Sequence, residues 1–430
     1  MSDTIFALAS GQARAGVAVV RLSGPGACDA VQALAGPLPV VRQAVLRRLV
    51  WQGQEIDQAL VLWFAGPHSF TGEDVAEFHL HGGRAVRQAL FVALAALGLR
   101  MAEPGEFSRR AVENGKLDLT QAEAIADLVD AETPAQLRQA LRQQDGALAA
   151  LIEGWRADLI AALGRAEAAI DFSDDGVGGE EFVAAKNAAA HIAQQIAQHL
   201  ALAGRGEALR EGLRLTILGP PNSGKSSLIN TLAQRPVAIV SDTPGTTRDV
   251  VEARLDLGGY LLLVADTAGV RQTSDAIEAE GVRRALSHAT GGMTLLLLDG
   301  SVPDPRAGLP ADLPEPDLTV WNKADLKPHD GISISLKTGN GVEALMDLLR
   351  QKVQQKLEGD GAPLLTRPRH REALTQARDH LLHGMGAPDD RPELLAEDLR
   401  LALRAVGRIT GRVDVEELLD FVFRDFCIGK

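Results

Sequence analysis

The chain has 430 residues, a formal net charge of −13, and 46% hydrophobic and 23% charged residues. This is the composition of ordinary globular protein, which excludes disorder as a global description, and the length predicts two to four domains. Aromatic residues make up only 4%, which argues against a platform that stacks single-stranded nucleic acid, and the acidic balance argues against nucleic-acid binding by bulk charge.

The only two cysteines, Cys28 and Cys427, lie near opposite ends of the chain. Their number excludes a disulfide framework and a cysteine-based metal cluster. Asp3 stands where a signal peptide has positive charge, and no stretch approaches the 18 or so apolar residues of a membrane span. We therefore expect a soluble protein of a reducing compartment, the cytoplasm.

The beginning of the chain predicts a mixed α+β domain over residues 1–117. Three β-rich runs, at 16–22, 58–64 and 75–80, are separated by Gly/Pro turns, and a helical stretch covers 85–97.

From about residue 119 the texture becomes helical, with apolar side chains at helical spacing over 120–170 and 180–203. Strand–helix alternation begins at 213–218 and continues to about residue 357, and helices return over 368–424. Insertion of one domain into another costs little where the ends of the insert lie close together. We therefore predict a helical domain made of two segments, 118–210 and 359–430, and interrupted by an α/β domain at 211–358.

The segment Gly219-Pro-Pro-Asn-Ser-Gly-Lys-Ser226 is a complete G-x-x-x-x-G-K-S motif between a predicted strand and a predicted helix. Such glycines let backbone N–H groups surround phosphate oxygens at the positive end of a helix. Lys225 is expected to reach the β- and γ-phosphates, and Ser226 to hold Mg²⁺.

Three further motifs follow in order, each at the end of a predicted strand. Asp266-Thr-Ala-Gly269 is placed to face the metal and the γ-phosphate. In Asn322-Lys-Ala-Asp325, the carboxylate can accept two hydrogen bonds that guanine offers and adenine does not. Asn322 and Lys323 would fix the base edge and cover the ring, and Ser335 lies in a further guanine-contacting loop. Four motifs in this order predict a guanine-nucleotide switch domain.

The residue after Asp266-Thr-Ala-Gly269 is Val270, which cannot orient water as the glutamine of small GTPases does. Either hydrolysis is very slow or another polar group acts. Glu278 is one candidate, and an exposed carboxylate at a helix start is the equally simple alternative. Asn222, together with carbonyls of the loop 241–249, could hold a monovalent cation such as K⁺ and so neutralise charge on the leaving group.

The chain resembles the bacterial tRNA-modification GTPase family MnmE (TrmE) over its whole length. The resemblance rests on five motifs, which are in chain order Phe70-Thr-Gly-Glu-Asp74, Asn222-Ser-Gly-Lys-Ser226, Gly245-Thr-Thr-Arg-Asp249, Asp266-Thr-Ala-Gly269 and Phe426-Cys-Ile-Gly-Lys430. It implies a K⁺-activated GTPase whose GTP-binding domain is inserted in a helical domain. It also implies a homodimer formed through a folate-binding-like N-terminal domain. A flavin- and NADH-using partner, MnmG, would act with it on the wobble uridine of certain tRNAs.

The resemblance also implies roles for residues. Glu278 becomes the water-orienting catalytic residue, and 5-formyl- or 5,10-methylene-tetrahydrofolate would be held by Arg21, Glu77, Lys116 and Lys430. Mg²⁺ would be held by Ser226 and Thr247, and K⁺ by Asn222, Ser241, Thr243 and Thr246. The residues expected to bind GTP are Asn222, Ser223, Gly224, Lys225, Ser226, Ser227, Ser241, Thr246, Thr247, Asp266, Thr267, Ala268, Gly269, Asn322, Lys323, Asp325 and Ser335.

Two positions depart from the family pattern. Leu336 stands where most relatives have alanine, which leaves the packing of that loop open, and Pro244 removes one backbone donor from the loop 241–249. Cys427 has three interpretations: burial as a small hydrophobic residue, a contribution to the site's architecture, or direct chemistry. For Cys28, in a predicted helix over 27–34, we expect packing alone.

Two further patterns invite functional interpretation. His79 and His81 alternate on a strand like a metal pair, but no third ligand is near in sequence, which favours a structural role. Arg400, Arg404, Arg408 and Arg412 form a basic stripe, either a solvated helix face or a contact for tRNA or a partner.

The sequence thus predicts an enzyme that hydrolyses GTP to GDP and phosphate. With its flavin-dependent partner it would form a 5-carboxymethylaminomethyl-type group on tRNA with a folate one-carbon unit. The alternative is a regulatory GTP-binding switch for ribosome assembly, which would have no need of a one-carbon carrier.

Overall fold

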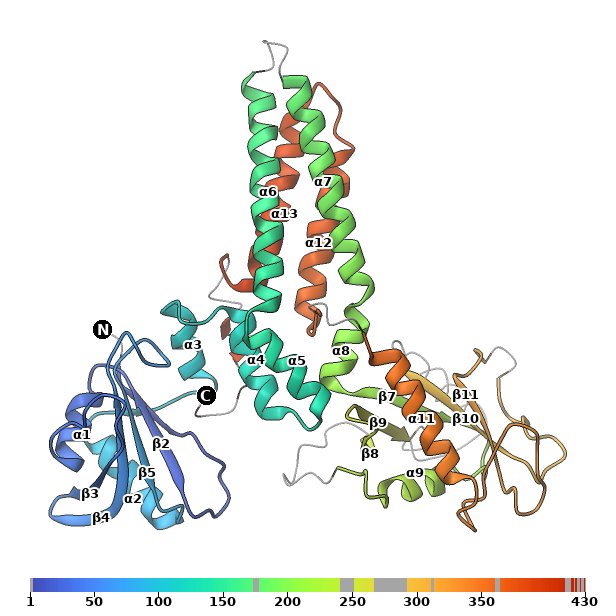
Figure 1. Ribbon diagram of the computed structural model, residues 1–430, viewed down its shortest axis with the longest axis horizontal. Coiled ribbons are helices and arrows are strands. Elements are labelled where there is room, and N and C mark those ends of the chain that lie inside the picture. The colour runs from blue at the N-terminus through green and yellow to red at the C-terminus, as the bar shows by residue number, and fades with distance from the viewer. Residues whose placement is uncertain are drawn as a thin grey trace. The chain divides into compact units, whose positions relative to one another are not determined.

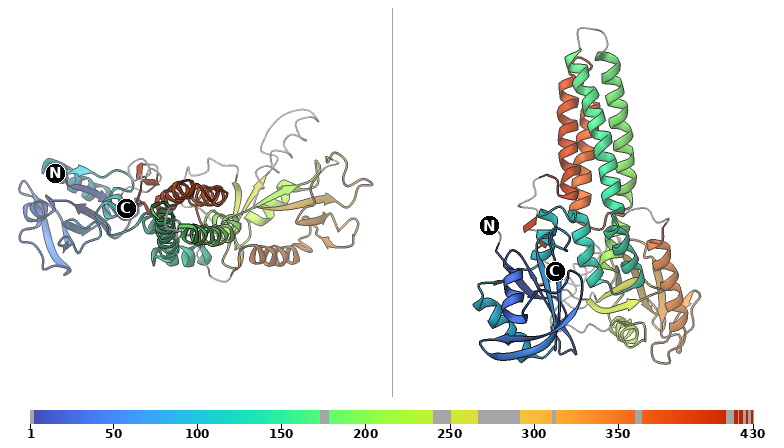
Figure 2. Two further views of the ribbon diagram at one scale, coloured as in Figure 1. Left: turned by 90° about the horizontal axis from the view of Figure 1, so that it is seen from above. Right: turned by 60° about the vertical axis from the view of Figure 1, so that its left-hand side comes forward.

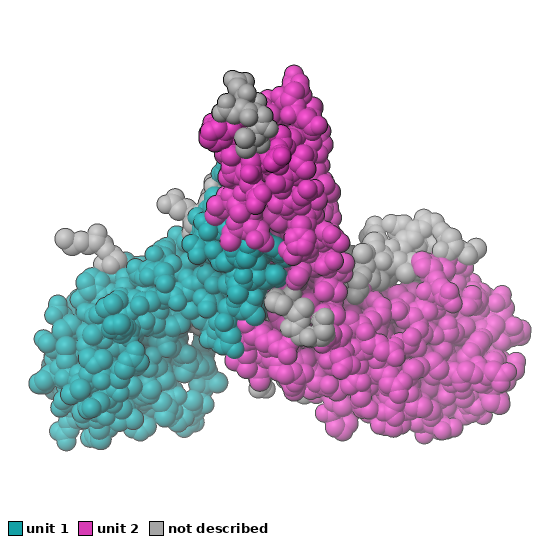
Figure 3. Space-filling view, turned by 45° about the horizontal axis from the view of Figure 1, so that its top comes forward, with its two compact units in different colours: residues 1–129, 143–156, 404–430 teal, residues 130–142, 157–403 magenta. Residues whose placement is uncertain are grey.

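The computed structural model describes residues 3–172, 178–239, 251–266, 292–310, 313–359 and 364–413, and the separate residues 419, 420, 422, 423, 426 and 429, with the backbone alone at 251, 252, 265 and 266. The chain divides into two compact units, coloured in Figure 3. Unit 1 comprises residues 1–129, 143–156 and 404–430, and unit 2 comprises residues 130–142 and 157–403.

Unit 1 is built on a six-stranded sheet of order β3-β4-β5-β2-β1-β6, antiparallel except for the pair β1–β6. Figure 1 labels strands β2 to β5 of this sheet. Its elements are β1 (Ile5–Leu8), β2 (Ala18–Ser23), α1 (Ala27–Ala35), β3 (Val45–Trp51), β4 (Gln54–Phe64), β5 (Val75–Leu80), α2 (Arg84–Ala96), β6 (Arg100–Met101), α3 (Glu106–Glu113) and α4 (Leu119–Asp130).

The two faces of this sheet differ because side chains alternate along each strand. On one face Val20, Leu22 and Phe78 join the main core with residues of α1 and α2. The opposite face carries Arg21 and Glu77, which the β2–β5 register places directly opposite each other. This face therefore holds charged side chains beside the smaller apolar cluster of Ile5, Ala7, Ala102 and Phe107.

The helical region contains long helices. Figures 1 and 2 show α6, α7, α12 and α13 running side by side as a bundle. The helices are α5 (Pro134–Gln144), α6 (Ala147–Asp171), α7 (Gly178–Ala201), α8 (Ala203–Glu211), α12 (Pro368–Met385) and α13 (Pro392–Thr410). Among the described residues, no helix is long and apolar enough to cross a membrane.

Between α8 and α12 in the chain lies a second six-stranded sheet, of order β12-β11-β10-β7-β9-β8, parallel except for β8. Its elements are β7 (Leu213–Leu218), α9 (Lys225–Ala233), β8 (Val251–Asp256), β9 (Leu261–Asp266), β10 (Met293–Asp299), β11 (Leu318–Asn322), β12 (Ile332–Ser333) and α11 (Val342–Leu357). Apolar residues of β7, β10, α9 and α11 share one core.

These elements confirm the predicted fold classes: an α+β N-terminal region, a helical region and an α/β region inserted between helical segments. The domain boundaries at 117, 210 and 358 stay predictions. The helical run predicted over 120–170 is three helices, α4, α5 and α6. The sequence patterns do not predict helix α3 or the strands β1 and β3.

Candidate functional site

The G-x-x-x-x-G-K-S segment forms the turn from β7 into α9. Asn222 has a positive φ of 61°, a conformation that asparagine tolerates better than most residues. The Lys225 ammonium lies inside the turn, where it donates to the carbonyls of Gly219 at 2.8 Å and Pro220 at 3.0 Å. A lysine charge and the N-terminus of α9 thus meet at one point, which suits an anion.

The loop after β11 is tied to this turn through Asn322. The side chain is buried, its Nδ2 donates to the Ser223 carbonyl at 2.9 Å, and its Oδ1 accepts from the Leu336 backbone N–H at 3.3 Å. A Cβ at Gly224 would lie 2.4 Å from the Asn322 Nδ2, so only glycine allows the approach. Asn322 therefore braces two loops, a role that its predicted contact with the base does not include.

Asp325 is oriented by the neighbouring loop. The Ser335 hydroxyl donates to Asp325 Oδ1 at 2.7 Å, and the Thr338 backbone N–H donates to the Ser335 Oγ at 3.2 Å. Leu336 packs against the core of the second sheet. The larger side chain of Leu336, where most relatives have alanine, is therefore accommodated by packing. The orientation of Asp325 depends on Ser335.

Asp299 is a residue of this site that sequence reasoning missed. It ends β10 and is mostly buried, and its Oδ2 lies 2.5 Å from the Lys323 Nζ. Burial alone would raise the pKa of Asp299, but the hydrogen bonds from Lys323 and Ser301 outweigh it and lower the pKa. The pair holds the Lys323 stem beside the loop. The sequence contained a signal for it, since Asp299 ends an apolar run as Asp266 and Asn322 do.

The carboxyl ends of the parallel strands gather these groups at one edge of the sheet. The phosphate-loop turn follows β7, Asp266 ends β9, Asn322 ends β11 and Ser335 follows β12. Ligands of open parallel sheets bind at this edge. The predicted site residues that the structure brings together here are Asn222, Ser223, Gly224, Lys225, Ser226, Ser227, Asn322, Lys323, Asp325 and Ser335.

The remaining predicted residues of this site lie outside the described residues. They are Ser241, Thr243, Pro244, Thr246, Thr247, Thr267, Ala268, Gly269, Val270 and Glu278, together with the side chain of Asp266.

A second candidate site lies on the charged face of the first sheet. Arg21 and Glu77 form an ion pair of 2.8 Å, and the Arg21 guanidinium lies 5.3 Å from the centre of the Phe70 ring. They line a pocket of about 250 Å³ together with Arg42 and Phe64. Burial alone would raise the pKa of Glu77, but the charge of Arg21 outweighs it and lowers the pKa. The Glu77 carboxylate can accept hydrogen bonds from the amino groups of a planar ring, and the Phe70 side chain beside it offers such a ring an aromatic surface.

Lys116, expected at this second site, is exposed, and its side chain passes close to Gly72 in the motif segment 70–74. Cys427 and Lys430 lie outside the described residues, but Gly429 is described. A Cβ at Gly429 would lie 2.2 Å from the Leu8 carbonyl oxygen, so Gly429 packs against the end of β1.

His79 and His81 each lie beside a carboxylate, and Cys28 packs against the core. His79 lies 3.1 Å from the Glu77 carboxylate, and His81 lies 2.8 Å from the Asp57 carboxylate. Over the residues that the structure describes there is no group of three or more His, Cys, Asp or Glu that could hold a metal ion. Cys28 packs in α1 against the main core, and burial raises the pKa of its thiol.

The basic stripe is partly paired within the protein. Arg400 forms ion pairs with Glu167 and Glu397, and Arg412 lies 2.6 Å from Glu153. Helix α13 ends at Thr410, so Arg412 lies beyond the helix. These contacts weaken the interpretation of the stripe as a surface for tRNA.

Comparison with known proteins gives matches along the whole chain. The family model "GTP-binding protein TrmE N-terminus" matches residues 4–116, and "MnmE helical domain" matches residues 119–427. The tRNA modification GTPase MnmE of Rhodospirillum rubrum is 53% identical, covering 100% of this chain and 99% of the relative. The protein of the same name from Paramagnetospirillum magneticum is 52% identical and covers 100% of both chains. Among solved structures, the G domain of the T. maritima FeoB iron transporter matches 34% of this chain and 99% of its own, with 20% identity and a TM-score of 0.21.

Proposed function

Since the chain belongs to the MnmE family of tRNA modification GTPases, we propose that it hydrolyses GTP to GDP and phosphate in the modification of the wobble uridine of certain tRNAs. The observation that carries this proposal is the shared sheet edge, where the phosphate-loop lysine and the guanine-type carboxylate follow strands β7 and β11. A ribosome-assembly switch would share that edge but not the paired charges of the N-terminal sheet.

The described residues of the site have different proposed roles in nucleotide binding. Lys225 is already held among loop carbonyls and would exchange them for phosphate oxygens. Asp325, oriented by Ser335, would accept from guanine. Asn322 would keep the phosphate loop and the base loop at a fixed separation.

We propose that two cations bind at this site. Ser226 lies in the first turn of α9 and Asn222 is exposed in the loop before the helix. Both offer oxygen ligands of the kind that Mg²⁺ and K⁺ prefer. We assign Mg²⁺ to Ser226 and Thr247, and K⁺ to Asn222, Ser241, Thr243 and Thr246. Such cations supply positive charge where the leaving phosphate develops negative charge. Glu278 would orient the attacking water.

We further propose that the pocket of Arg21 and Glu77 binds a tetrahydrofolate derivative, the 5-formyl or 5,10-methylene form. The fit rests on an acceptor carboxylate, a guanidinium and the aromatic side chains of Phe70 and Phe64 lining one pocket of about 250 Å³. The folate would supply a one-carbon unit. Lys116 and Lys430 complete the assignment as further charged groups.

The N-terminal sheet also supports the proposed homodimer. On the edge hairpin, Leu46 and Leu60 are cross-strand partners with exposed fractions of 62% and 43%. The exposed Val50 lies on the same strand as Leu46, and Val40 and Val41 precede it. Exposed apolar side chains on and beside an edge strand favour contact with another chain. We assign this apolar edge, defined as Val40, Val41, Leu46, Val50 and Leu60, to contact with a second copy of the chain.

The proposed reaction needs tRNA and a flavin- and NADH-dependent partner similar to MnmG, and we propose that the protein acts with them in the cytoplasm. The test is reconstitution: the purified chain, such a partner, tRNA, GTP and the folate, followed by mass spectrometry of tRNA nucleosides. The wild type should yield the 5-carboxymethylaminomethyl-type nucleoside, and Lys225→Ala should not. Equal product from the Lys225→Ala protein would refute a role for GTP at this site.

A further inference from the structure

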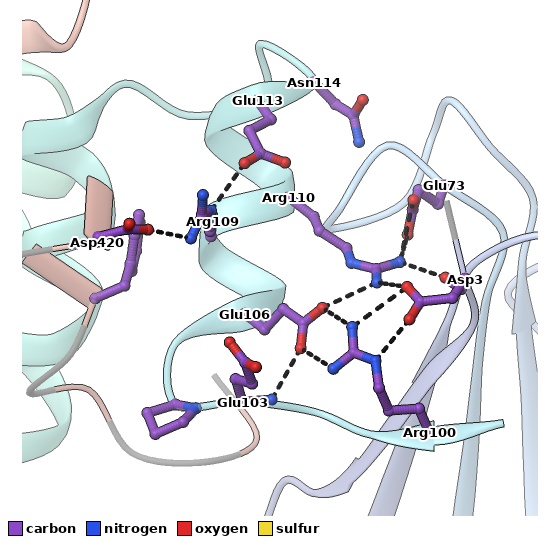
Figure 4. A pocket seen from close by; sticks show the side chains of 12 residues that line it. Asp3, Glu73, Arg100, Glu103, Glu106, Arg109, Arg110, Glu113, Asn114 and Asp420 are labelled. Carbon is purple, nitrogen blue, oxygen red and sulfur yellow. Dashed lines mark hydrogen bonds and ion pairs between the residues drawn. The ribbon is translucent and has the colours of Figure 1, made fainter. Parts of the chain in front are cut away.

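Helix α3 lies between two segments that are far apart in the sequence. Figure 4 shows its adjacent arginines, Arg109 and Arg110, pointing to opposite sides. Both contribute to the wall of a pocket of about 640 Å³. Each guanidinium contacts a different segment of the chain.

Arg110 contacts the segment 70–74 and the N-terminus. Its guanidinium, mostly buried, donates to Glu73 at 3.0 Å, to the Asp3 carboxylate at 2.7 Å and to Glu106 at 2.9 Å. One turn further along, Asn114 donates to the Thr71 carbonyl at 2.7 Å. Because buried charged hydrogen bonds are costly to break, this side of α3 fixes the segment that begins at Phe70.

Arg109 contacts the C-terminal segment. Its guanidinium donates to Glu113 at 2.9 Å and to Asp420 at 2.6 Å. Gly105, just before α3, lies so close to the Phe423 and Phe426 side chains that a Cβ there would be within 2.9 Å of both. The described residues of this C-terminal segment are Leu419, Asp420, Val422, Phe423, Phe426 and Gly429.

Both segments lead to the same strands. The Phe70 ring lies against the Arg21 guanidinium, and Gly429 touches the Leu8 carbonyl at the end of β1. In the β1–β2 register Leu8 pairs with Val20, one residue from Arg21. The two segments that α3 holds thus reach the sheet within one residue pair of the proposed folate pocket.

We propose that Arg109 and Arg110 are positioning residues of the folate site: Arg110 holds the segment 70–74 against the sheet, and Arg109 holds the described C-terminal residues through Asp420. The inference rests on the proposed folate binding. Neither arginine needs to touch the ligand. Removing Arg109 should therefore weaken folate binding indirectly, through the lost contact with Asp420.

The test is isothermal titration of the full chain with 5-formyltetrahydrofolate. Arg109→Gln and Asp420→Asn should each weaken binding about 2- to 5-fold, as expected for the loss of an ion pair whose Asp420 side chain is 72% exposed. The double variant should bind no more weakly than either single variant, because both remove the same interaction. The conservative variant Arg109→Lys keeps the positive charge beside Asp420 and Glu113 and should retain most of the affinity. Arg84→Gln, which removes an exposed arginine of α2, is the matched control and should bind like the wild type.

Wild-type affinity in Arg109→Gln would overturn the inference. So would additive losses in the double variant, or an Arg109→Lys protein that binds no better than Arg109→Gln, since a merely structural role predicts both. If the wild type itself does not bind the folate, the proposed folate site is wrong, and the inference that rests on it is wrong with it. Wild-type binding together with unaltered variants would contradict the positioning role alone.

Discussion

At the residue scale, Asp325 illustrates how a motif residue depends on its neighbours. Its carboxylate accepts a hydrogen bond from the Ser335 hydroxyl, and the Ser335 oxygen accepts one from the Thr338 backbone N–H. One oxygen of the carboxylate is therefore already oriented by the protein before guanine binds. The roles of Asp325 and Ser335 in guanine binding could be predicted from the sequence. The hydrogen bond between them could not, because it depends on how the loops after β11 and β12 fold.

Asp325→Asn should change nucleotide preference. An amide replaces one acceptor with a donor, which matches the carbonyl that xanthine has in place of the guanine amine. We expect the ratio of GTP to XTP affinity to fall by at least ~10²-fold, since sites built around a hydrogen bond discriminate strongly. Competition between fluorescent GTP and XTP measures it. An unchanged preference would show that another residue reads the base.

Glu278→Ala should lower GTP turnover by about 10²- to 10⁴-fold, the range for a lost general base or water-orienting group. Affinity for GTP should change little, because the residue is assigned to water and not to the nucleotide. Single-turnover hydrolysis and equilibrium GTP binding separate the two effects. Turnover at the wild-type rate would show that Glu278 does not orient the attacking water.

At the element scale, the strands with clear signals could be predicted nearly to the residue, as β5 and β7 show. Each is an apolar or alternating run with a clear boundary. Helix α3 escaped prediction because it is short and carries four charged residues, and its packing depends on Phe107 in a small cluster. Its role as a link between distant segments is a tertiary property that no local pattern contains.

The ion pairs around α3 should make stability depend on acid pH. The hydrogen bond from Arg100, assisted by Arg110, lowers the pKa of Asp3 from 3.8 to about 2. A depressed pKa stabilises the fold above the ordinary value, and this contribution is lost as the pH falls through about 2. The Tm of Asp3→Asn should therefore lie below that of the wild type at about pH 5, with the difference shrinking toward about pH 2. Thermal unfolding followed by circular dichroism measures it, and a difference that stays constant with pH would contradict the assignment.

At the scale of the whole molecule, the fold classes and their order could be predicted from composition and motifs, because each texture extends over many residues. The candidate folate pocket could not be derived that way. Arg21 and Glu77 are separated by two strands and a helix, and only the pairing of β2 with β5 places them opposite each other. The edge position of β3, and with it the apolar edge, likewise follows from sheet order.

Leu46→Lys should weaken the proposed dimer. A charge in the middle of the apolar edge removes apolar contact area and places two like charges near each other across a symmetric interface. We expect the dimer Kd to rise at least ~10-fold. Sedimentation velocity over a concentration series measures it. Val92→Lys is the matched control, since Val92 is an exposed valine on α2. A dimer that is equally stable in both variants would place the interface elsewhere.

A K⁺ held at Asn222 is central to the proposed hydrolysis of GTP at the phosphate site. The most direct measurement is GTP turnover in KCl and in NaCl at equal ionic strength, for the wild type, for Asn222→Ala and for the matched exposed amide of α9, Asn230→Ala. We expect faster turnover in K⁺ for the wild type and for Asn230→Ala, and no K⁺ response in Asn222→Ala with GTP binding retained. Equal wild-type turnover in the two salts would contradict the role of K⁺.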